Sequence, residues 1–457
     1  MNGREDSTNR APWALRRASA GATGVVFVVS FIVFILLVER TWGINSSDSG
    51  TVLPTATLWA HGLGGCALVT PAGASTYPLS GPVFPLLDAF LQWVLRLGRS
   101  SPFPAHLAAH HCANAYSGAF TWVTTVPLGN QELNVGLVTW PVLALGALSF
   151  LRTTSRSHTR SEWLLLGALA LSPGAVFAFT DYYHPEDLLA LGLLLACAGA
   201  LRRAHYVAVG VIGVLAFASQ QNVVLALLVI ASALPHARAV RRAALGSILS
   251  VLVLEVPLVL WSGPRILSVT LVGTGLTDNP AWGTWMAQLH LAGSSALWIS
   301  RAGPLLATAL LLAWLRRRPL SALGLLGAFE VVFTARLVFE ENLWGYYGLA
   351  ILTCWTLTGV VRQRLEVGVV VWAALLVLNT GLDNGLFRLP PTLAHDERVW
   401  WFQLILLPLA MILSLRDLVT ATSSTPRRRE RRPSNDEPTG VSATAGELPR
   451  GTPSTPE

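Results

Sequence analysis

The residues best suited to chemistry are concentrated in one short stretch, Asp181–Asp187, which combines carboxylates, tyrosines and a histidine. Apolar runs at about 161–180 and 188–201 flank it. Because lipid does not tolerate charge or unpaired backbone, we expect this stretch where two membrane helices meet water. Pro185 suits the first position of the second helix, and Glu186 and Asp187 then fall in its first turn, near the positive end of the helix dipole. The stretch is therefore either a stable helix start or a polar site at the membrane boundary.

The composition places the chain among polytopic membrane proteins. Of its 457 residues, 52% are hydrophobic and only 12% are charged, whereas soluble domains carry about 25% charged residues. The net charge of +7 comes from short basic clusters between apolar runs. This distribution is typical of membrane topology, and we predict no nucleic-acid partner.

The apolar runs predict an all-α fold with about twelve transmembrane helices. The first, Gly21–Val38, is long enough to cross a bilayer at roughly 20 residues per crossing, and we interpret it as an uncleaved helix. The runs at 205–218 and 221–234 are short and are either crossings or re-entrant segments. The remaining runs lie near 133–151, 161–180, 188–201, 243–261, 303–315, 320–338, 343–361, 366–380 and 399–415.

The loops between these runs alternate in charge. Arginine-rich loops, such as the one with Arg316, Arg317 and Arg318, alternate with loops that lack such clusters. By the positive-inside rule, both termini are cytoplasmic in a multi-pass plasma-membrane protein. We predict a cytoplasmic segment at 1–20, a transmembrane domain at 21–416, and a disordered cytoplasmic tail at 417–457 whose arginines contact anionic lipids.

The first outer loop, residues 42–130, is unusually long, and long loops in compact proteins commonly have a function. Its stretch Val83–Leu97 is apolar with polar side chains interspersed, which favours an interfacial amphipathic helix. The same loop contains Cys66 and Cys112, and a disulfide between them is an open possibility in an oxidising compartment. No zinc-like spacing of cysteine and histidine occurs, so we predict no metal site.

The distinctive polar stretches all fall on the predicted outer face. They are the loop with Asp48, the Asp181–Asp187 turn, Gln220-Gln221-Asn222, and Arg336 with the segment Glu340–Tyr347. A site at this boundary suits an amphipathic substrate that has a polar head group and an apolar tail. Arg336 suits a phosphate of such a lipid through its planar pair of donors. It fits equally well as an interfacial anchor or a partner of Glu340.

Three motifs resemble a known family: His184-Pro185-Glu186-Asp187, the Ala216–Asn222 segment, and Arg336 followed by Tyr346-Tyr347. Together with the long first outer loop, they resemble the integral-membrane glycosyltransferases of the GT-C class, especially the α-mannosyltransferase-like proteins of family 87. The resemblance in architecture covers roughly residues 20–416.

The resemblance implies an inverting transfer of mannose, or of another hexose or pentose, from a polyprenyl-phosphate donor to a lipid-linked or glycan acceptor at the outer face. It implies no cofactor besides this donor lipid. By position Asp48 would be the general base, which must reach the acceptor hydroxyl. From the residues alone, Asp48 fits a helix N-cap or an Asx-turn equally well. The residues that the resemblance assigns to substrate binding are His184, Glu186, Asp187, Gln220, Gln221, Arg336, Tyr346 and Tyr347.

One departure from the family weakens the parallel. Where members often have a Lys-Gln pair, this chain has Gln220-Gln221, which can donate hydrogen bonds but cannot neutralise a phosphate. Two other functions therefore stay open. The mid-helix carboxylates Glu255 and Glu330 would suit a transporter or flippase of lipid-linked sugars, and the departure would suit an inactive membrane scaffold. The sequence does not define the sugar, the acceptor or the oligomeric state.

Overall fold

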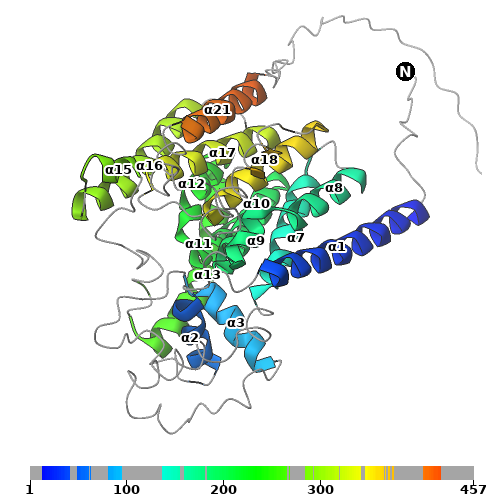
Figure 1. The fold of residues 1–457 in the computed structure, drawn as a ribbon, viewed down its shortest axis with the longest axis horizontal. Coiled ribbons are helices and arrows are strands. Elements are labelled where there is room, and N and C mark those ends of the chain that lie inside the picture. Colours follow the sequence, from blue (N-terminus) through cyan, green and yellow to red (C-terminus); the bar gives the residue numbers. More distant parts are fainter. Residues whose placement is uncertain are drawn as a thin grey trace, which may run out of the picture.

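Every regular element in the described part of the chain is a helix, as predicted (Figure 1). The computed structural model describes residues 13–41, 49–60, 62, 81–94, 136–154, 159–180, 183–264, 267, 284–291, 293–316, 318, 320–340, 345–364, 366, 369–370, 373–374 and 405–423. Up to residue 232 the helices are α1 (Trp13–Thr41), α2 (Ser49–Ala60), α3 (Val83–Val94), α7 (Thr139–Leu151), α8 (Thr159–Ala170), α9 (Pro173–Thr180), α10 (Pro185–Arg202), α11 (Tyr206–Ser219), η3 (Gln221–Val223) and α12 (Val224–Ser232). Beyond it they are α13 (Ala237–Ser262), α15 (Trp285–Gln288), α16 (Gly293–Leu315), α17 (Ala322–Val338), η4 (Gly345–Gly348), α18 (Leu349–Arg362) and α21 (Leu407–Ser423).

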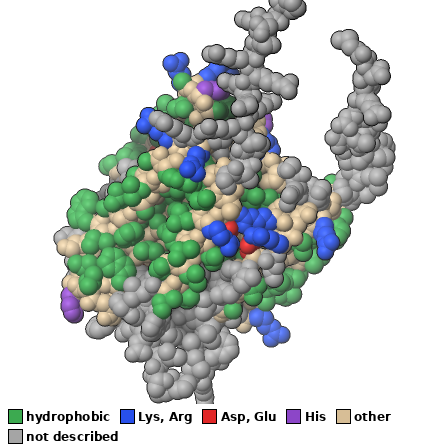
Figure 2. All heavy atoms as spheres, turned by 90° about the horizontal axis from the view of Figure 1, so that it is seen from above, with side chains coloured by type: hydrophobic (Ala, Val, Ile, Leu, Met, Phe, Trp, Pro, Cys, Tyr) green, Lys and Arg blue, Asp and Glu red, His purple; other side chains and the backbone are tan. Residues whose placement is uncertain are grey.

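Four helical stretches are long and apolar enough to cross a membrane: Ala20–Arg40, Thr159–Thr180, Ala237–Trp261 and Trp298–Leu315. In three of them only 22–28% of the apolar window is buried within the protein. Their remaining surface is apolar, and Figure 2 shows broad hydrophobic areas interrupted by few charged side chains. Surfaces of this kind are stable against lipid, which supports assignment as a membrane protein.

Small residues let the helices of the core approach one another closely. A Cβ added at Gly146 of α7 would lie 2.0 Å from the carbonyl oxygen of Gly192 in α10. Similarly, a Cβ at Gly210 of α11 would lie 1.9 Å from the carbonyl oxygen of Ala243 in α13. Such glycine contacts bring backbones together where no hydrophobic effect drives helices to associate. They fix the positions of α10 and α11, the two helices that frame the candidate site.

Several predicted runs are interrupted or shortened in the structure. The run at 161–180 consists of two helices, because α8 ends at Ala170 and α9 begins at Pro173. The runs at 205–218 and 221–234 correspond to α11, with 14 residues, and to η3 with α12, which has nine. At 1.5 Å per residue neither helix spans a hydrocarbon core of about 30 Å on its own. The count of about twelve crossings stays a prediction, because the run at 366–380 lies mostly outside the described residues.

The predicted outer loop and the predicted C-terminal tail differ in detail from the structure. The expected interfacial helix at 83–97 is α3, and it packs against α2, a helix that the sequence did not reveal. Figure 1 shows α2 and α3 together at one end of the bundle. At the other boundary, α21 continues to Ser423, past the predicted start of a disordered tail at residue 417. Its threonines donate hydrogen bonds to carbonyls one turn earlier, as Thr420 does to Arg416.

Candidate functional site

The turn between α9 and α10 is held in a tight conformation by its own residues. Tyr183 has a φ of 66°, and its buried ring lies edge-on to Phe179 and Phe84. The backbone N–H of His184 donates to the carbonyl of Ala178, which ties the turn to the end of α9. Gly136 is required beside it, since a Cβ there would lie 2.8 Å from the hydroxyl oxygen of Tyr183. Asp181 and Tyr182 lie outside the described residues.

The predicted start of α10 is confirmed. Pro185 opens the helix, and Glu186 and Asp187 occupy its first turn. His184 Nδ1 lies 2.8 Å from Glu186 Oε1, and both side chains are buried. The imidazole of His184 also stacks on the ring of Tyr346, with the ring centroids 4.3 Å apart. His184 and Glu186 therefore form a buried pair that supports the position of Tyr346.

Arg336 lies in the last turn of α17, next to the two predicted tyrosines. Its Nη2 is 3.1 Å from Glu340 Oε2, and its guanidinium carbon lies 4.8 Å from the centre of the Tyr347 ring. Tyr347 packs edge-on against Tyr346, with 4.7 Å between ring centroids, and both tyrosines belong to η4. The sequence left open whether Arg336 is a partner of Glu340, and the structure confirms that the two residues form an ion pair. That ion pair does not exclude a ligand, because both side chains are partly accessible.

These residues meet at one small cavity. Its polar lining consists of Asp187, Gln220, Asn222, Arg336 and the two tyrosines Tyr346 and Tyr347. They come from the start of α10, the junction of α11 with η3, the end of α17, and η4. The volume is about 30 Å³, enough for a water molecule but not for a sugar phosphate. A larger ligand would therefore contact these side chains from the rim of the cavity.

Burial of Asp187 raises the pKa of its carboxyl to about 6, and the neighbouring charge of Glu186 adds to this effect. His184, Arg336 and a hydrogen bond from Gln220 act in the opposite direction. Asp187 precedes the apolar run of α10 and lies outside the four membrane-spanning stretches. Its carboxyl can thus exchange a proton near neutral pH, which is a property of functional sites.

The structure separates the predicted site residues into three groups. Asp187, Gln220, Arg336, Tyr346 and Tyr347 line the cavity. His184 and Glu186 pack behind Tyr346, so their role in the described structure is to position it, and Gln221 in η3 does not line the cavity. Asp48, the predicted general base, lies outside the described residues, directly before the start of α2.

Sequence reasoning passed over two residues of this site. Asn222 belongs to the quoted Gln220-Gln221-Asn222 stretch, but it was not selected for substrate binding. It reaches the cavity because Gln220 is extended, with a φ of −153°, and η3 follows immediately. Glu340 was named only as a partner for Arg336. Its spacing of four residues from Arg336 was the available signal.

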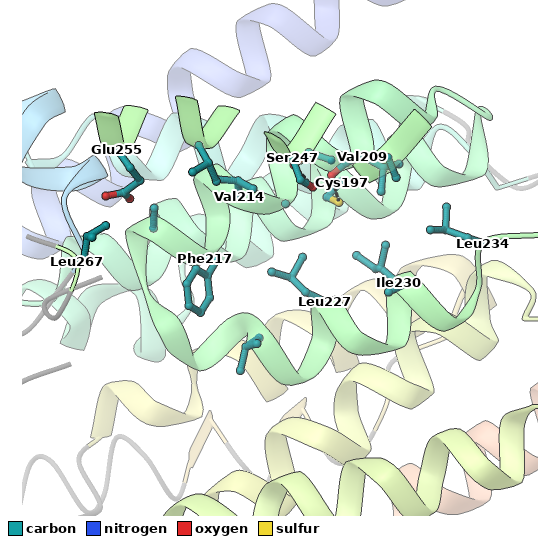
Figure 3. A pocket seen from close by; sticks show the side chains of 17 residues that line it. Cys197, Val209, Val214, Phe217, Leu227, Ile230, Leu234, Ser247, Glu255 and Leu267 are labelled. Atoms are coloured by element: carbon teal, nitrogen blue, oxygen red, sulfur yellow. Dashed lines mark hydrogen bonds between the residues drawn. The ribbon is translucent and has the colours of Figure 1, made fainter. Parts of the chain in front are cut away.

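A second, much larger cavity lies between α10, α11, α12 and α13. It has a volume of about 580 Å³ and an almost entirely apolar lining. Its polar groups are Cys197, Ser247 and Glu255. Figure 3 shows Glu255 at one end of the cavity and Leu234 at the other.

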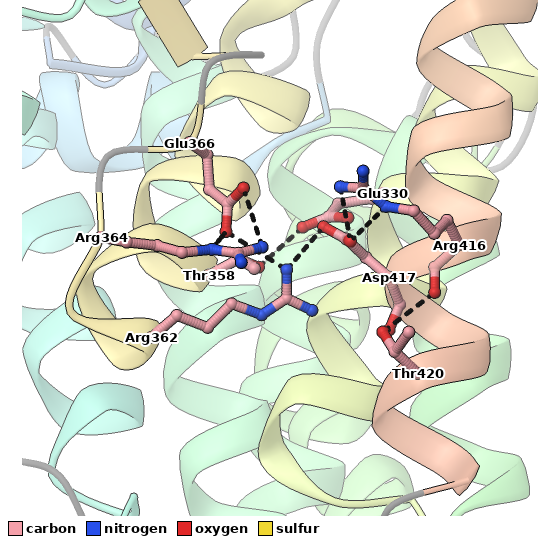
Figure 4. Close-up of polar contacts among 8 residues, drawn as sticks. All are labelled: Glu330, Thr358, Arg362, Arg364, Glu366, Arg416, Asp417 and Thr420. Atoms are coloured by element: carbon pink, nitrogen blue, oxygen red, sulfur yellow. Dashed lines mark hydrogen bonds and ion pairs between the residues drawn. The ribbon is translucent and has the colours of Figure 1, made fainter.

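A separate polar cluster joins α17, α18 and α21 (Figure 4). Glu330 accepts a hydrogen bond of 2.8 Å from Thr358, and Arg362 pairs with Asp417 at 3.0 Å and with Glu366 at 3.2 Å. Burial alone would raise the pKa of Glu366, but hydrogen bonds from Arg364 and Arg362 outweigh it and hold that pKa below its usual value. Among the described residues no cluster of three or more histidine, cysteine or acidic side chains is arranged to hold a metal ion.

Comparison with known proteins adds no relative to these observations, since neither the protein-family models nor the curated proteins contain a match to this sequence. The resemblance to GT-C glycosyltransferases therefore rests on the sequence motifs alone.

Proposed function

We propose that this protein is an inverting membrane glycosyltransferase that takes a sugar from a polyprenyl-phosphate donor and transfers it to a lipid-linked or glycan acceptor at the outer face of the plasma membrane. The observation that carries the proposal is the meeting of Asp187, Gln220, Arg336, Tyr346 and Tyr347 at one cavity. These residues come from four separate segments that the sequence motifs had singled out. Polar side chains that converge where apolar helices begin or end are what a site at a membrane boundary requires.

In the proposed reaction, an acceptor hydroxyl oxygen attacks the anomeric carbon of the donor sugar. The bond between that carbon and the phosphate oxygen breaks, and its electron pair leaves with the polyprenyl phosphate. The proton of the attacking hydroxyl passes to the carboxylate of Asp48. Arg336 stabilises the negative charge of the phosphate, and Gln220 and Asn222 supply hydrogen bonds to the head group.

One described residue of the predicted first outer loop, Gly81, lies beside the cavity. The N–H of Gly81 donates to the carbonyl of Ser219 at 3.3 Å, and Ser219 directly precedes Gln220. A Cβ at Gly81 would lie 2.1 Å from the carbonyl oxygen of Ala218, so the loop passes against the end of α11. Gly81 of this loop therefore lies beside Gln220, a residue of the cavity, while Asp48 lies outside the described residues.

A transporter or flippase for lipid-linked sugars is the second candidate. The apolar cavity of about 580 Å³ with Glu255 at one end favours it, as does the buried carboxylate of Glu330 in α17. Intramembrane carboxylates commonly mark transport pathways. The glycosyltransferase is preferred because Glu330 is hydrogen-bonded to Thr358 within the cluster of Figure 4, whereas the sequence motifs converge on Arg336.

The deciding experiment uses the purified protein in lipid nanodiscs with a panel of radiolabelled polyprenyl-phosphate sugars and an envelope-lipid acceptor extract. Wild type is compared with Asp48→Asn and with Glu39→Gln, a matched control that neutralises an exposed carboxylate on α1. We expect wild type and Glu39→Gln to move label into the acceptor, and Asp48→Asn to lose transfer while still folding. Full activity in Asp48→Asn would exclude Asp48 as the base. Scrambling of lipid in vesicles without any sugar transfer would favour the transporter.

A further inference from the structure

The charges around the cavity are not balanced for an anionic ligand. Among the described residues that line the cavity, Arg336 is the one cation, and two carboxylates act on it, Glu340 by a direct ion pair and Asp187 through its nearby charge. With both carboxylates ionised, this group carries one negative charge in excess. A phosphate that approached Arg336 would therefore meet net repulsion, which is strong where water is partly excluded.

The Arg336–Glu340 pair places a carboxylate oxygen where a phosphate oxygen would be expected. Its separation of 3.1 Å is close to that of a charge-assisted hydrogen bond between guanidinium and phosphate. The cavity offers no further room for an anion beside Arg336, since its volume is about 30 Å³. To reach Arg336 inside the cavity, an anionic ligand would therefore have to take the place of one of the two carboxylates.

Glu340 is the carboxylate that can leave. It follows Phe339, the C-cap residue of α17, and so lies outside the helix. Its side chain is 19% exposed, which gives it access to solvent. Asp187, by contrast, is fixed in the first turn of α10 and bonded to Gln220.

The backbone before Glu340 is held in place, so Arg336 would stay while Glu340 turns away. The indole N–H of Trp285 donates to the carbonyl of Val338 at 2.6 Å. Phe339 lies between Trp285, with ring centroids 6.3 Å apart, and Gly303 of α16. A change of side-chain rotamer at Glu340 would then suffice to free Arg336.

We propose that Glu340 occupies the anion position beside Arg336 in the ligand-free protein and that the phosphate of a polyprenyl-phosphate lipid displaces it. Binding is then an exchange of one anion for another, and Glu340 sets the affinity for the phosphate. This inference rests on the proposed function in one respect, namely that the ligand is a lipid phosphate. It makes Glu340 a determinant of ligand affinity without contact to the reacting atoms.

The test measures the binding of radiolabelled polyprenyl phosphate to the full protein in nanodiscs, with sugar transfer measured in parallel. Glu340→Gln is expected to lower Kd about tenfold, the equivalent of roughly 1.4 kcal/mol. Arg336→Gln is expected to weaken binding, and Glu340→Asp to bind more weakly than Glu340→Gln because it keeps the competing charge. Glu366→Gln is the matched control, because Glu366 pairs with arginines outside the cavity and should leave Kd unchanged. Raising the salt concentration should reduce the difference in Kd between wild type and Glu340→Gln, because salt screens the charge of Glu340.

Each result bears on the inference separately from the proposed function. Unchanged or weaker binding in a folded Glu340→Gln protein would overturn the displacement of Glu340. If Arg336→Gln at the same time lost both binding and transfer, the proposed glycosyltransferase function would still stand. Tighter binding in Glu340→Gln with no transfer by any variant would uphold the displacement and reject the enzyme. Absence of polyprenyl-phosphate binding in every variant would reject both.

Discussion

Replacing Arg336 by glutamine tests whether this residue serves structure, ligand binding or both. In the folded protein, Arg336 neutralises Glu340 across 3.1 Å and lies over the ring of Tyr347. Its loss leaves the carboxylates of Glu340 and Asp187 without that positive charge. Breaking a fully buried ion pair on one side costs about 3–5 kcal/mol. Because the side chains of Arg336 and Glu340 are 15% and 19% exposed, we expect about 2–3 kcal/mol here.

The same substitution should weaken the binding of a lipid phosphate. A hydrogen bond to a charged group contributes about 1.5–3 kcal/mol, which corresponds to a loss of roughly 10- to 150-fold in Kd. The two effects can be separated with the double variant Arg336→Gln/Glu340→Gln. Removing Glu340 as well eliminates one unpaired carboxylate, so the double variant should regain much of the lost stability, but it should bind the lipid phosphate far more weakly than Glu340→Gln, which keeps the guanidinium.

Thermal unfolding followed by tryptophan fluorescence in nanodiscs measures the first effect, and titration with radiolabelled polyprenyl phosphate measures the second. Glu340→Gln alone completes the double-mutant cycle. If the double variant recovered both stability and binding, Arg336 would be a structural residue and the proposed site would be wrong. If stability did not recover, the ion pair would not be the source of the destabilisation.

Two further predictions concern pH and packing. The folded protein raises the pKa of Asp187 to about 6 from an ordinary value of 3.8, so folding binds a proton between these values, and the contribution of Asp187 to stability should rise as pH falls from about 7 to about 4, whereas Glu366, whose pKa is lowered, acts in the opposite direction. As pH falls across this range, the unfolding temperature of wild type should increase relative to that of Asp187→Asn. Equal slopes of unfolding temperature against pH for the two proteins would contradict this prediction. Separately, Gly146→Val should destabilise the protein by about 2 kcal/mol or more, because its Cβ would overlap the backbone of Gly192. Gly167→Val on α8 is the matched control, since nothing lies within 4 Å of a Cβ there, and comparable losses in both would refute the packing argument.

Local chemistry made some parts of the fold predictable. Pro185 with Glu186 and Asp187 behind it predicted the start of α10, because a fixed φ and the helix dipole act within one turn. The same reasoning, applied to Ser172-Pro173, would have divided the run at 161–180 into α8 and α9. The helix α2 was missed because its sequence, rich in threonine and containing Pro54, has the composition of a loop. Its packing against α3 stabilises a helix that local propensity does not favour.

The site was predictable only to the level of a shared face. Charge alternation between loops predicts Asp187, Gln220 and Arg336 on one side of the membrane, but it does not say which loops touch. Their meeting depends on contacts far apart in sequence, such as Gly146 against Gly192 and Gly81 against Ala218. Close backbone contacts of this kind leave no periodic signal, since glycine occurs in loops and helices alike.

The balance of charge distinguishes the two polar clusters and indicates which one is available for a ligand. In the cluster of Figure 4, Glu366 pairs with Arg362 and Arg364, Asp417 pairs with Arg362 and Arg416, and Glu330 accepts a hydrogen bond from Thr358. A network in which the ion-paired carboxylates are neutralised by arginines holds helices together and gains nothing from a further ion. Around Arg336, two carboxylates share one guanidinium, and one of the two lies beyond the end of its helix. A carboxylate on a replaceable side chain is one that an anionic ligand can exchange for, so we propose ligand binding at Arg336 and assign the cluster at Arg362 to the packing of α17, α18 and α21.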